Sequence, residues 1–110
     1  MKATILSGRD VSGIIRERIR HEIDAIRQQY ADQKGFVLPG LAVIQVGDNA
    51  ASSIYVKNKK KACEAAGIVS FGYSLDADTS QEDLIELIRT LNSDGRIHGI
   101  LCQLPLPEHM

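Results

Sequence analysis

The sequence has no tryptophan, and aromatic residues make up only 5% of its 110 residues. It also has no excess of one charge: 13 lysines and arginines stand against 14 aspartates and glutamates, a net charge of −1. This balance argues against a general nucleic-acid-binding protein, which carries a strong basic excess. The apolar runs are too short to cross a membrane, and no signal-peptide pattern opens the chain. We therefore expect a cytoplasmic protein that binds neither nucleic acid nor membrane.

Residues that commonly bind metals are scarce and widely spaced. Cys63 and Cys102 lie far apart, and the sequence contains no Cys-x-x-Cys motif. Such thiols are expected to be reduced in a cytoplasmic protein. The histidines show no metal-ligand spacing; they are His21, His98 and His109. The sequence therefore predicts no metal site.

The length and the hydrophobic periodicity predict one α/β domain over residues 1–110. A chain of this size buries roughly two thirds of its unfolded surface and can fold alone. Apolar residues recur at steps of three and four between Val11 and Tyr30, behind a potential N-cap at Asp10. The segment 79–82, Thr-Ser-Gln-Glu, fits a capping box before another amphipathic helix. Strands are predicted at 3–6, 41–46, 69–75 and 99–104, and helices at 11–30, 51–66 and about 81–91.

Strands and helices thus alternate along the whole chain. Alternation of this kind predicts a three-layer α/β sandwich with a mainly parallel sheet and right-handed crossovers. The continuous apolar run 41–46 is typical of a strand buried on both faces. In such sheets ligands bind beyond the carboxyl ends of the strands. We therefore expect the functional residues at the turn after residue 46 and after the last strand.

The helix at 51–66 carries the candidate functional residues. At about 100° per residue, Ser52, Tyr55 and Lys59 fall within roughly a 60° arc. Apolar surroundings favour the neutral form of a lysine, which can then act as a base or acid. A tyrosine one turn away offers a ring for stacking and a hydroxyl for orienting a ligand. A boundary tyrosine and a surface lysine show the same spacing, so spacing alone leaves both interpretations open.

Gln103 is the candidate partner for this helix. It lies at the carboxyl end of the last predicted strand. If that strand is parallel to and near the strand at 41–46, Gln103 can approach Lys59 and Tyr55. Its amide could then hydrogen-bond the lysine amine or a polar group of a ligand. A residue that merely caps backbone groups at a strand end is the competing interpretation.

Two long segments resemble the signatures of a known family. The segment 46–62, from Val46-Gly47-Asp48 to Ala62, resembles the first signature of the bifunctional methylenetetrahydrofolate dehydrogenase/methenyltetrahydrofolate cyclohydrolase family. The segment 98–107 resembles that family's next motif, and the segments 5–9 and 39–42 are also similar to it. The resemblance covers essentially the whole chain.

The resemblance implies an activity and roles for the candidate residues. The family oxidises 5,10-methylenetetrahydrofolate to the methenyl form with NADP or NAD and hydrolyses that form to 10-formyltetrahydrofolate. Lys59 matches the catalytic lysine, Gln103 the glutamine that contacts it, and Tyr55 the tyrosine that stacks on the folate. Ser52 matches a serine near the same site. All four are expected to contact the tetrahydrofolate substrate.

The resemblance also implies that part of the enzyme is missing. Residues 1–110 correspond to an N-terminal catalytic domain of the aminoacid-dehydrogenase-like type, ending before its return helix and the Rossmann domain that binds NADP. The sequence contains no Gly-x-Gly-x-x-Gly motif. The chain alone is expected to be inactive or weakly active and monomeric, whereas the parent enzyme is expected to be a homodimer.

Two other functions remain open on the sequence. A short-chain dehydrogenase also uses Tyr-x-x-x-Lys with an upstream serine, but it requires a glycine-rich loop after its first strand. The segment 7–10, Ser-Gly-Arg-Asp, does not provide one. The other alternative is a non-catalytic module of the same fold that binds folate or mediates interactions. Intact Tyr55, Lys59 and Gln103 argue against a degenerate relative.

Overall fold

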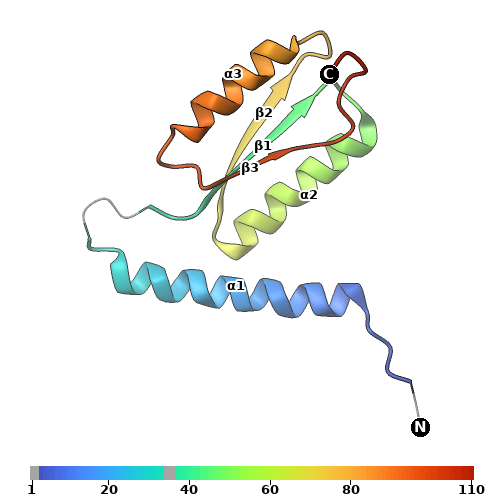
Figure 1. The fold of residues 1–110 in the computed structure, drawn as a ribbon. Coiled ribbons are helices and arrows are strands. Elements are labelled where there is room, and N and C mark those ends of the chain that lie inside the picture. Colours follow the sequence, from blue (N-terminus) through green and yellow to red (C-terminus); the bar gives the residue numbers. More distant parts are fainter. Residues whose placement is uncertain (1–2, 34–36) are drawn as a thin grey trace. The chain divides into compact units, whose positions relative to one another are not determined.

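The computed structural model describes residues 3–33 and 37–110, which fall in two compact units divided after residue 36. The first unit contains one helix, α1 (Gly8–Tyr30). In the second unit three strands alternate with two helices (Figure 1). These elements are β1 (Gly40–Val46), α2 (Ala50–Ala66), β2 (Val69–Leu75), α3 (Gln81–Asn92) and β3 (Gly99–Cys102).

The first unit confirms the long helix but not the strand before it. Ser7, rather than Asp10, caps α1, and its hydroxyl accepts a hydrogen bond from the backbone amide of Asp10 at 3.3 Å. Residues 3–7 form no strand, and the side chains of Ile5 and Leu6 are exposed. A short apolar run becomes a strand only where a neighbouring strand takes up its backbone hydrogen bonds. The sheet described here pairs β1 with β2 and β3 and includes no strand from residues 3–7.

The sheet of the second unit is parallel throughout, in the order β2-β1-β3. The chain moves from β1 to β2 in one direction and returns past β1 to reach β3. Right-handed crossovers in opposite directions place their helices on opposite faces of a sheet. Accordingly, α2 and α3 lie on either side of the strands (Figure 1). The predicted three-layer arrangement is confirmed, with three strands in place of the four expected.

Residue parity along the strands decides which face each side chain occupies. On β1, Ala42, Ile44 and Val46 pack with Leu84 and Leu91 of α3. The core cluster is completed by partly buried apolar side chains from β2, α3, the turn before β3, β3 and the C-terminal segment: Phe71, Tyr73, Leu75, Leu87, Ile88, Ile97, Ile100, Cys102, Leu106 and Met110. Successive residues of a strand point to opposite faces. The odd-numbered residues of β1, and the residues next to Cys102, therefore face α2.

β3 ends two residues earlier than predicted. Its last strand residue is Cys102, although the backbone amide of Gln103 still donates to the carbonyl of Ile44 at 2.8 Å. The chain then leaves the sheet at Leu104, because Pro105 has no amide hydrogen with which to extend the ladder. Gln103 therefore lies immediately beyond the last strand residue, with the parity that faces α2.

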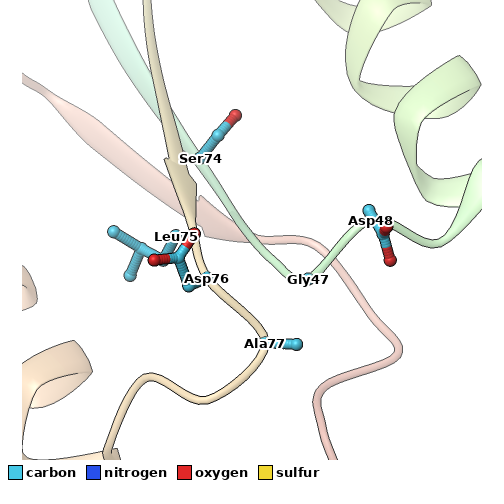
Figure 2. Close-up of a pocket in the computed structure, with 6 residues that line it drawn as sticks. All are labelled: Gly47, Asp48, Ser74, Leu75, Asp76 and Ala77. Atoms are coloured by element: carbon cyan, nitrogen blue, oxygen red, sulfur yellow. The ribbon is translucent and has the colours of Figure 1, made fainter.

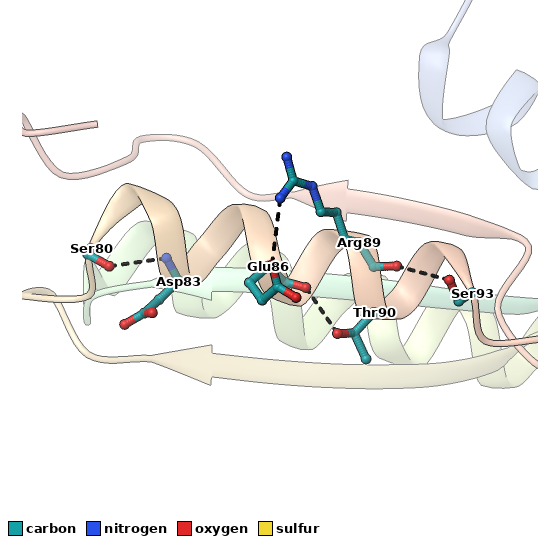
Figure 3. Close-up of polar contacts among 6 residues, drawn as sticks. All are labelled: Ser80, Asp83, Glu86, Arg89, Thr90 and Ser93. Atoms are coloured by element: carbon teal, nitrogen blue, oxygen red, sulfur yellow. Dashed lines mark hydrogen bonds and ion pairs between the residues drawn. The ribbon is translucent and has the colours of Figure 1, made fainter.

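α3 begins one residue later than the predicted capping box implies. Ser80, not Thr79, is the cap, and its hydroxyl accepts a hydrogen bond from the amide of Asp83 at 3.1 Å (Figure 3). Further along the helix, Arg89 lies 3.7 Å from the carboxylate of Glu86, at the exposed surface. The hydroxyl of Thr90 donates to the Glu86 carbonyl. These contacts lie on the polar side of α3 and leave its apolar side free for the sheet.

The turn before β3 fixes where that strand starts. Asp94 accepts hydrogen bonds from the backbone amide and the guanidinium of Arg96, the shortest at 2.7 Å. Gly40 and His98 exchange two hydrogen bonds: the Gly40 amide donates to His98 Nδ1 at 2.9 Å, and the His98 amide donates to the Gly40 carbonyl at 2.8 Å. This turn aligns β3 with β1 and so determines the position of Gln103.

Replacing Gly40 with alanine is expected to destabilise the fold. A Cβ atom at this position would lie 2.0 Å from the carbonyl oxygen of Arg96, so the backbone of the turn must move. Overpacking of this kind costs about 1–3 kcal/mol in the free energy of unfolding, which chemical denaturation measures. Gly72→Ala in β2 is the matched control, because its Cβ would meet nothing within 4 Å. If the two substitutions lowered the stability equally, the close approach of the Arg96 carbonyl to Gly40 could not be the cause.

The Asp94–Arg96 pair predicts a loss of stability in acid. Hydrogen bonds from the Arg96 side chain and backbone hold the pKa of Asp94 at about 2, below its ordinary value of 3.8. The pair therefore stabilises the fold fully above about pH 4, and this contribution disappears as the pH falls through about 2. In thermal unfolding, wild type should exceed Asp94→Asn at pH 6 and approach it near pH 2. Asp78→Asn, at an exposed position, serves as control. A gap between wild type and Asp94→Asn that does not change with pH would refute the prediction.

Candidate active site

The turn between β1 and α2 positions the first functional segment. Gly47 adopts a φ of 89°, which glycine tolerates, and its amide donates to the carbonyl of Leu75 at 2.9 Å. Asn49 caps α2: its side-chain oxygen accepts a hydrogen bond from the amide of Ser52 at 3.0 Å. At the other end Gly67, in the left-handed conformation, ends α2 as predicted. α2 therefore begins directly above the carboxyl end of β1.

The structure brings Lys59 and Gln103 together, as the sequence predicted. Lys59 Nζ donates a hydrogen bond to Gln103 Oε1 across 44 positions of the chain. Both side chains are half-buried. The contact forms because Gln103 has the parity that faces α2 and because β3 lies directly beside β1. The pair is therefore a consequence of the sheet order and of strand parity together.

A carbonyl group holds the amide of Gln103 in one orientation. Gln103 Nε2 donates to the carbonyl oxygen of Leu104 at 3.0 Å. A carbonyl oxygen only accepts hydrogen bonds, so it selects the NH₂ end of the amide. The oxygen end is then left to face Lys59. Gln103 is thereby set as an acceptor for the lysine amine.

Ser52 supports the same carbonyl from the helix. Its side chain is buried, with 2% of its surface exposed, and its hydroxyl donates to the Leu104 carbonyl at 3.2 Å. The hydroxyl hydrogen is thus used inside the protein. Ser52 lies near the pair, as the resemblance implied, but what it contacts is the segment after β3.

Tyr55 lies at the surface of α2. Its side chain is 54% exposed, and in the ranges 3–33 and 37–110 its hydroxyl forms no hydrogen bond, including with Lys59 or Gln103. Two other apolar side chains are also exposed: Ile54 on α2, and Leu104 in the segment after β3. The ring is therefore available for stacking against a planar ligand.

A cavity lies at the carboxyl ends of β1 and β2, and it includes the turn after residue 46, where the sequence predicted functional residues. Its volume is about 290 Å³, and Gly47, Asp48, Ser74, Leu75, Asp76 and Ala77 line it (Figure 2). None of Ser52, Tyr55, Lys59 or Gln103 lines it. The position beyond the carboxyl end of a parallel strand predicted the turn that supplies Gly47 and Asp48, but the sequence did not single out the residues at the end of β2. Two carboxylates, those of Asp48 and Asp76, line the cavity. The Lys59–Gln103 pair lies elsewhere, between α2 and the residue that follows β3.

Neither cysteine belongs to the site. Burial, with a further contribution from Glu64, raises the pKa of the Cys63 thiol, and burial raises that of Cys102. Both thiols are free, and a raised pKa makes them poor nucleophiles. The described part of the chain has no group of three or more metal-ligating side chains placed to hold an ion. In the same ranges, no helix combines the length and hydropathy needed to cross a membrane.

Comparison with known proteins identifies the family. The model of the family "Tetrahydrofolate dehydrogenase/cyclohydrolase, catalytic domain" matches residues 6–110. The bifunctional protein FolD of Acetivibrio thermocellus is 47% identical over 110 residues, which is all of this chain and 36% of that protein. FolD of Legionella pneumophila (strain Corby) is also 47% identical over the whole chain and 37% of its own length. The chain thus spans about a third of these relatives.

Solved structures agree with this match. The bifunctional FolD methylenetetrahydrofolate dehydrogenase/cyclohydrolase of Campylobacter jejuni aligns with a TM-score of 0.87 and 44% identity, covering 96% of this chain and 36% of that one. The Trypanosoma brucei enzyme, solved with NADP cofactor and inhibitor, aligns with a TM-score of 0.88 and 33% identity, covering 100% and 36%. The chain therefore belongs to the tetrahydrofolate dehydrogenase/cyclohydrolase family and matches that family's catalytic domain.

Proposed function

We propose that this chain forms the folate-binding half of an enzyme that oxidises 5,10-methylenetetrahydrofolate with NADP and hydrolyses the methenyl product to 10-formyltetrahydrofolate. The observation that carries the proposal is the Lys59–Gln103 hydrogen bond at the carboxyl end of the sheet. The family match and the names of the relatives support it.

Lys59 is proposed as the general base and acid of the hydrolytic step. The methenyl substrate is a cation with an electron-poor carbon between two nitrogens, and water must add to that carbon. A cation beside Lys59 favours the neutral amine, which can take a proton from the attacking water. The proton is then given to the nitrogen that leaves when its bond to that carbon breaks, and the second proton of the water is released to solvent as the carbonyl of the formyl group forms. Gln103 accepts one N–H of Lys59 and so directs the nitrogen lone pair away from the amide.

Tyr55 and Ser52 have different parts in the proposal. The exposed ring of Tyr55 would stack on the pterin of the substrate and hold it in line with Lys59. Ser52 was expected to contact substrate, but its hydroxyl donates to the Leu104 carbonyl. We therefore assign Ser52 to positioning: it steadies the carbonyl that orients the Gln103 amide.

The oxidative step requires a second binding site. The cofactor supplies the hydride acceptor, so the protein mainly aligns two rings. We assign NADP to a part of the enzyme other than these 110 residues, because the sequence has no glycine-rich nucleotide motif. Folate turnover is placed in the cytoplasm, where free thiols such as Cys63 and Cys102 persist. We propose a monomer for the chain and a homodimer for the parent enzyme.

One observation favours a second candidate, a folate-binding module without turnover. Tyr55 and Leu104 are 54% and 67% exposed, so the pair is not enclosed by the chain itself. A site that does not exclude bulk water loses part of the electrostatic effect on which catalysis depends. Binding of folate without hydrolysis by the parent enzyme would select the second candidate.

Replacing Lys59 tests the first candidate directly. In the parent enzyme, hydrolysis of methenyltetrahydrofolate, followed by its absorbance, is expected to fall by roughly 10²–10⁴-fold in Lys59→Ala, because general acid–base catalysis contributes about that much. Lys60→Ala, at the exposed neighbouring position, should retain the wild-type rate. Circular dichroism checks that both variants are folded. Equal rates in wild type and Lys59→Ala would remove Lys59 from its assigned role.

Replacing Ser52 tests the support of the Leu104 carbonyl. Ser52→Ala removes a buried hydrogen bond and is expected to lower the free energy of unfolding by about 0.5–1.5 kcal/mol. Ser93→Ala on α3 is the control: its hydroxyl also donates to a carbonyl, that of Arg89 at 3.4 Å, but is exposed. Its effect should stay within about 0.5 kcal/mol. Denaturant unfolding of the three proteins measures both changes. A control as destabilised as Ser52→Ala would show that burial of the bond contributes nothing.

A further inference from the structure

Gln45 is a buried polar residue to which the proposed function assigns no role. It lies in β1, where the neighbouring residues are apolar, and 7% of its surface is exposed. Among the described residues the other buried polar side chain is Ser52. Burying an amide costs free energy unless its groups are hydrogen-bonded. A glutamine at this position therefore depends on specific partners.

Those partners lie in the first turn of α2. Gln45 Nε2 donates to the hydroxyl of Ser53 at 3.1 Å and to the carbonyl of Asn49 at 3.4 Å. The Asn49 carbonyl also accepts the amide of Ser53 at 2.9 Å, the first hydrogen bond of the helix. The amide of Gln45 thus binds both the cap and the first turn of α2.

Strand register places Gln45 next to Gln103. Ile44 pairs with Cys102 in the parallel β1–β3 ladder, and the Gln103 amide donates to the Ile44 carbonyl. The next positions on the two strands are Gln45 and Gln103. Neighbouring strands lie about 4.8 Å apart, and equal parity puts both side chains on the α2 face. The residue that anchors α2 and the residue that meets Lys59 are therefore neighbours under the same helix.

The other buried contact near the N-terminal end of α2 is the hydrogen bond from Ser52 to the Leu104 carbonyl, which holds the segment after Gln103. Toward its C-terminal end the helix buries Cys63 and Ala66, two small side chains. Apolar burial is non-directional and tolerates sliding and rotation, whereas a hydrogen bond fixes both distance and angle. The rotation of α2 about its axis decides whether Lys59 reaches Gln103. The directional contacts near the N-terminal end, those of Gln45 and of Ser52, therefore set that rotation.

We infer that Gln45 is a positioning residue for the proposed hydrolytic reaction: by anchoring Asn49 and Ser53 it sets, together with the Ser52–Leu104 hydrogen bond, the rotation of α2 that brings Lys59 to Gln103. The inference rests on the proposed function for its catalytic consequence. Its geometric consequence, the position of Lys59 beside Gln103, rests on the structure alone. Gln45 acts through Lys59 and touches no reacting atom.

The test compares Gln45→Met, Ser53→Ala, the double variant and Thr90→Ala. Methionine keeps the length of the side chain without its donor. Thr90, whose hydroxyl donates to the Glu86 carbonyl on α3, is the control. In methenyltetrahydrofolate hydrolysis by the parent enzyme, kcat is expected to fall about tenfold in Gln45→Met while KM stays within about twofold, since small misplacement of a catalytic group mainly costs rate. Ser53→Ala should lower kcat less, because it removes only one of the two acceptors of Gln45. The double variant should lower kcat no further than Gln45→Met, because the contact with Ser53 is already lost in that variant. Thr90→Ala should match wild type.

A second measurement separates this inference from the proposed function. The nuclear Overhauser contact between the Lys59 and Gln103 side chains is recorded in wild type and in each variant, together with thermal unfolding. Loss of this contact in folded Gln45→Met supports the inference even if wild type hydrolyses nothing, an outcome that would overturn only the proposed function. An unchanged contact, or kcat losses that add in the double variant, would overturn the inference. If Gln45→Met does not fold, Ser53→Ala, altered at an exposed position, decides by the same contact.

Discussion

The parallel pairing of β3 with β1 is the constraint on which the candidate site depends. β1 is central, with β2 on one side and β3 on the other. Its hydrogen bonds to β3 decide where the chain after Cys102 lies and, through parity, which face Gln103 occupies. The Gly40–His98 hydrogen bonds set the start of this ladder. A shift of one residue would turn Gln103 toward α3 and remove it from Lys59.

Around this ladder, amide and hydroxyl groups form a connected set of directional contacts. Ser52 and Gln103 both donate to the Leu104 carbonyl, and Gln103 in turn accepts from Lys59. Each partner restricts the orientation of the next, so the lysine meets an oxygen rather than an NH₂ group. Apolar packing alone could hold the helix on the sheet, but it could not select that orientation.

The site is assembled from two segments and is open on one side. Tyr55, one helical turn before Lys59 on α2, and Leu104, the residue after Gln103, are both exposed. Such a surface suits a planar ligand that covers it and excludes water as it binds. The chain spans about a third of its FolD relatives.

Local patterns in the sequence determined most of the elements. Periodicity identified the helices and the strand buried on both faces, and Gly67 marked the end of α2. The same patterns misplaced two caps, at Asp10 and Thr79, because a neighbouring serine satisfied the free backbone amides equally well. They also predicted a strand at 3–6, since propensity contains no information about whether a partner strand exists.

Spacing on one helix and the family resemblance named Ser52, Tyr55 and Lys59, and the end of a strand named Gln103. Whether these residues meet, and what Ser52 contacts, was decided only by the order of the strands in the sheet. Gln45 was not identified from the sequence at all, because it reads there as one residue of an apolar strand. Residues 44 and 58 positions apart become neighbours only through strand pairing and crossover direction. The sequence by itself thus determined the elements and the chemistry that they carry; the tertiary structure decided which of those groups face one another.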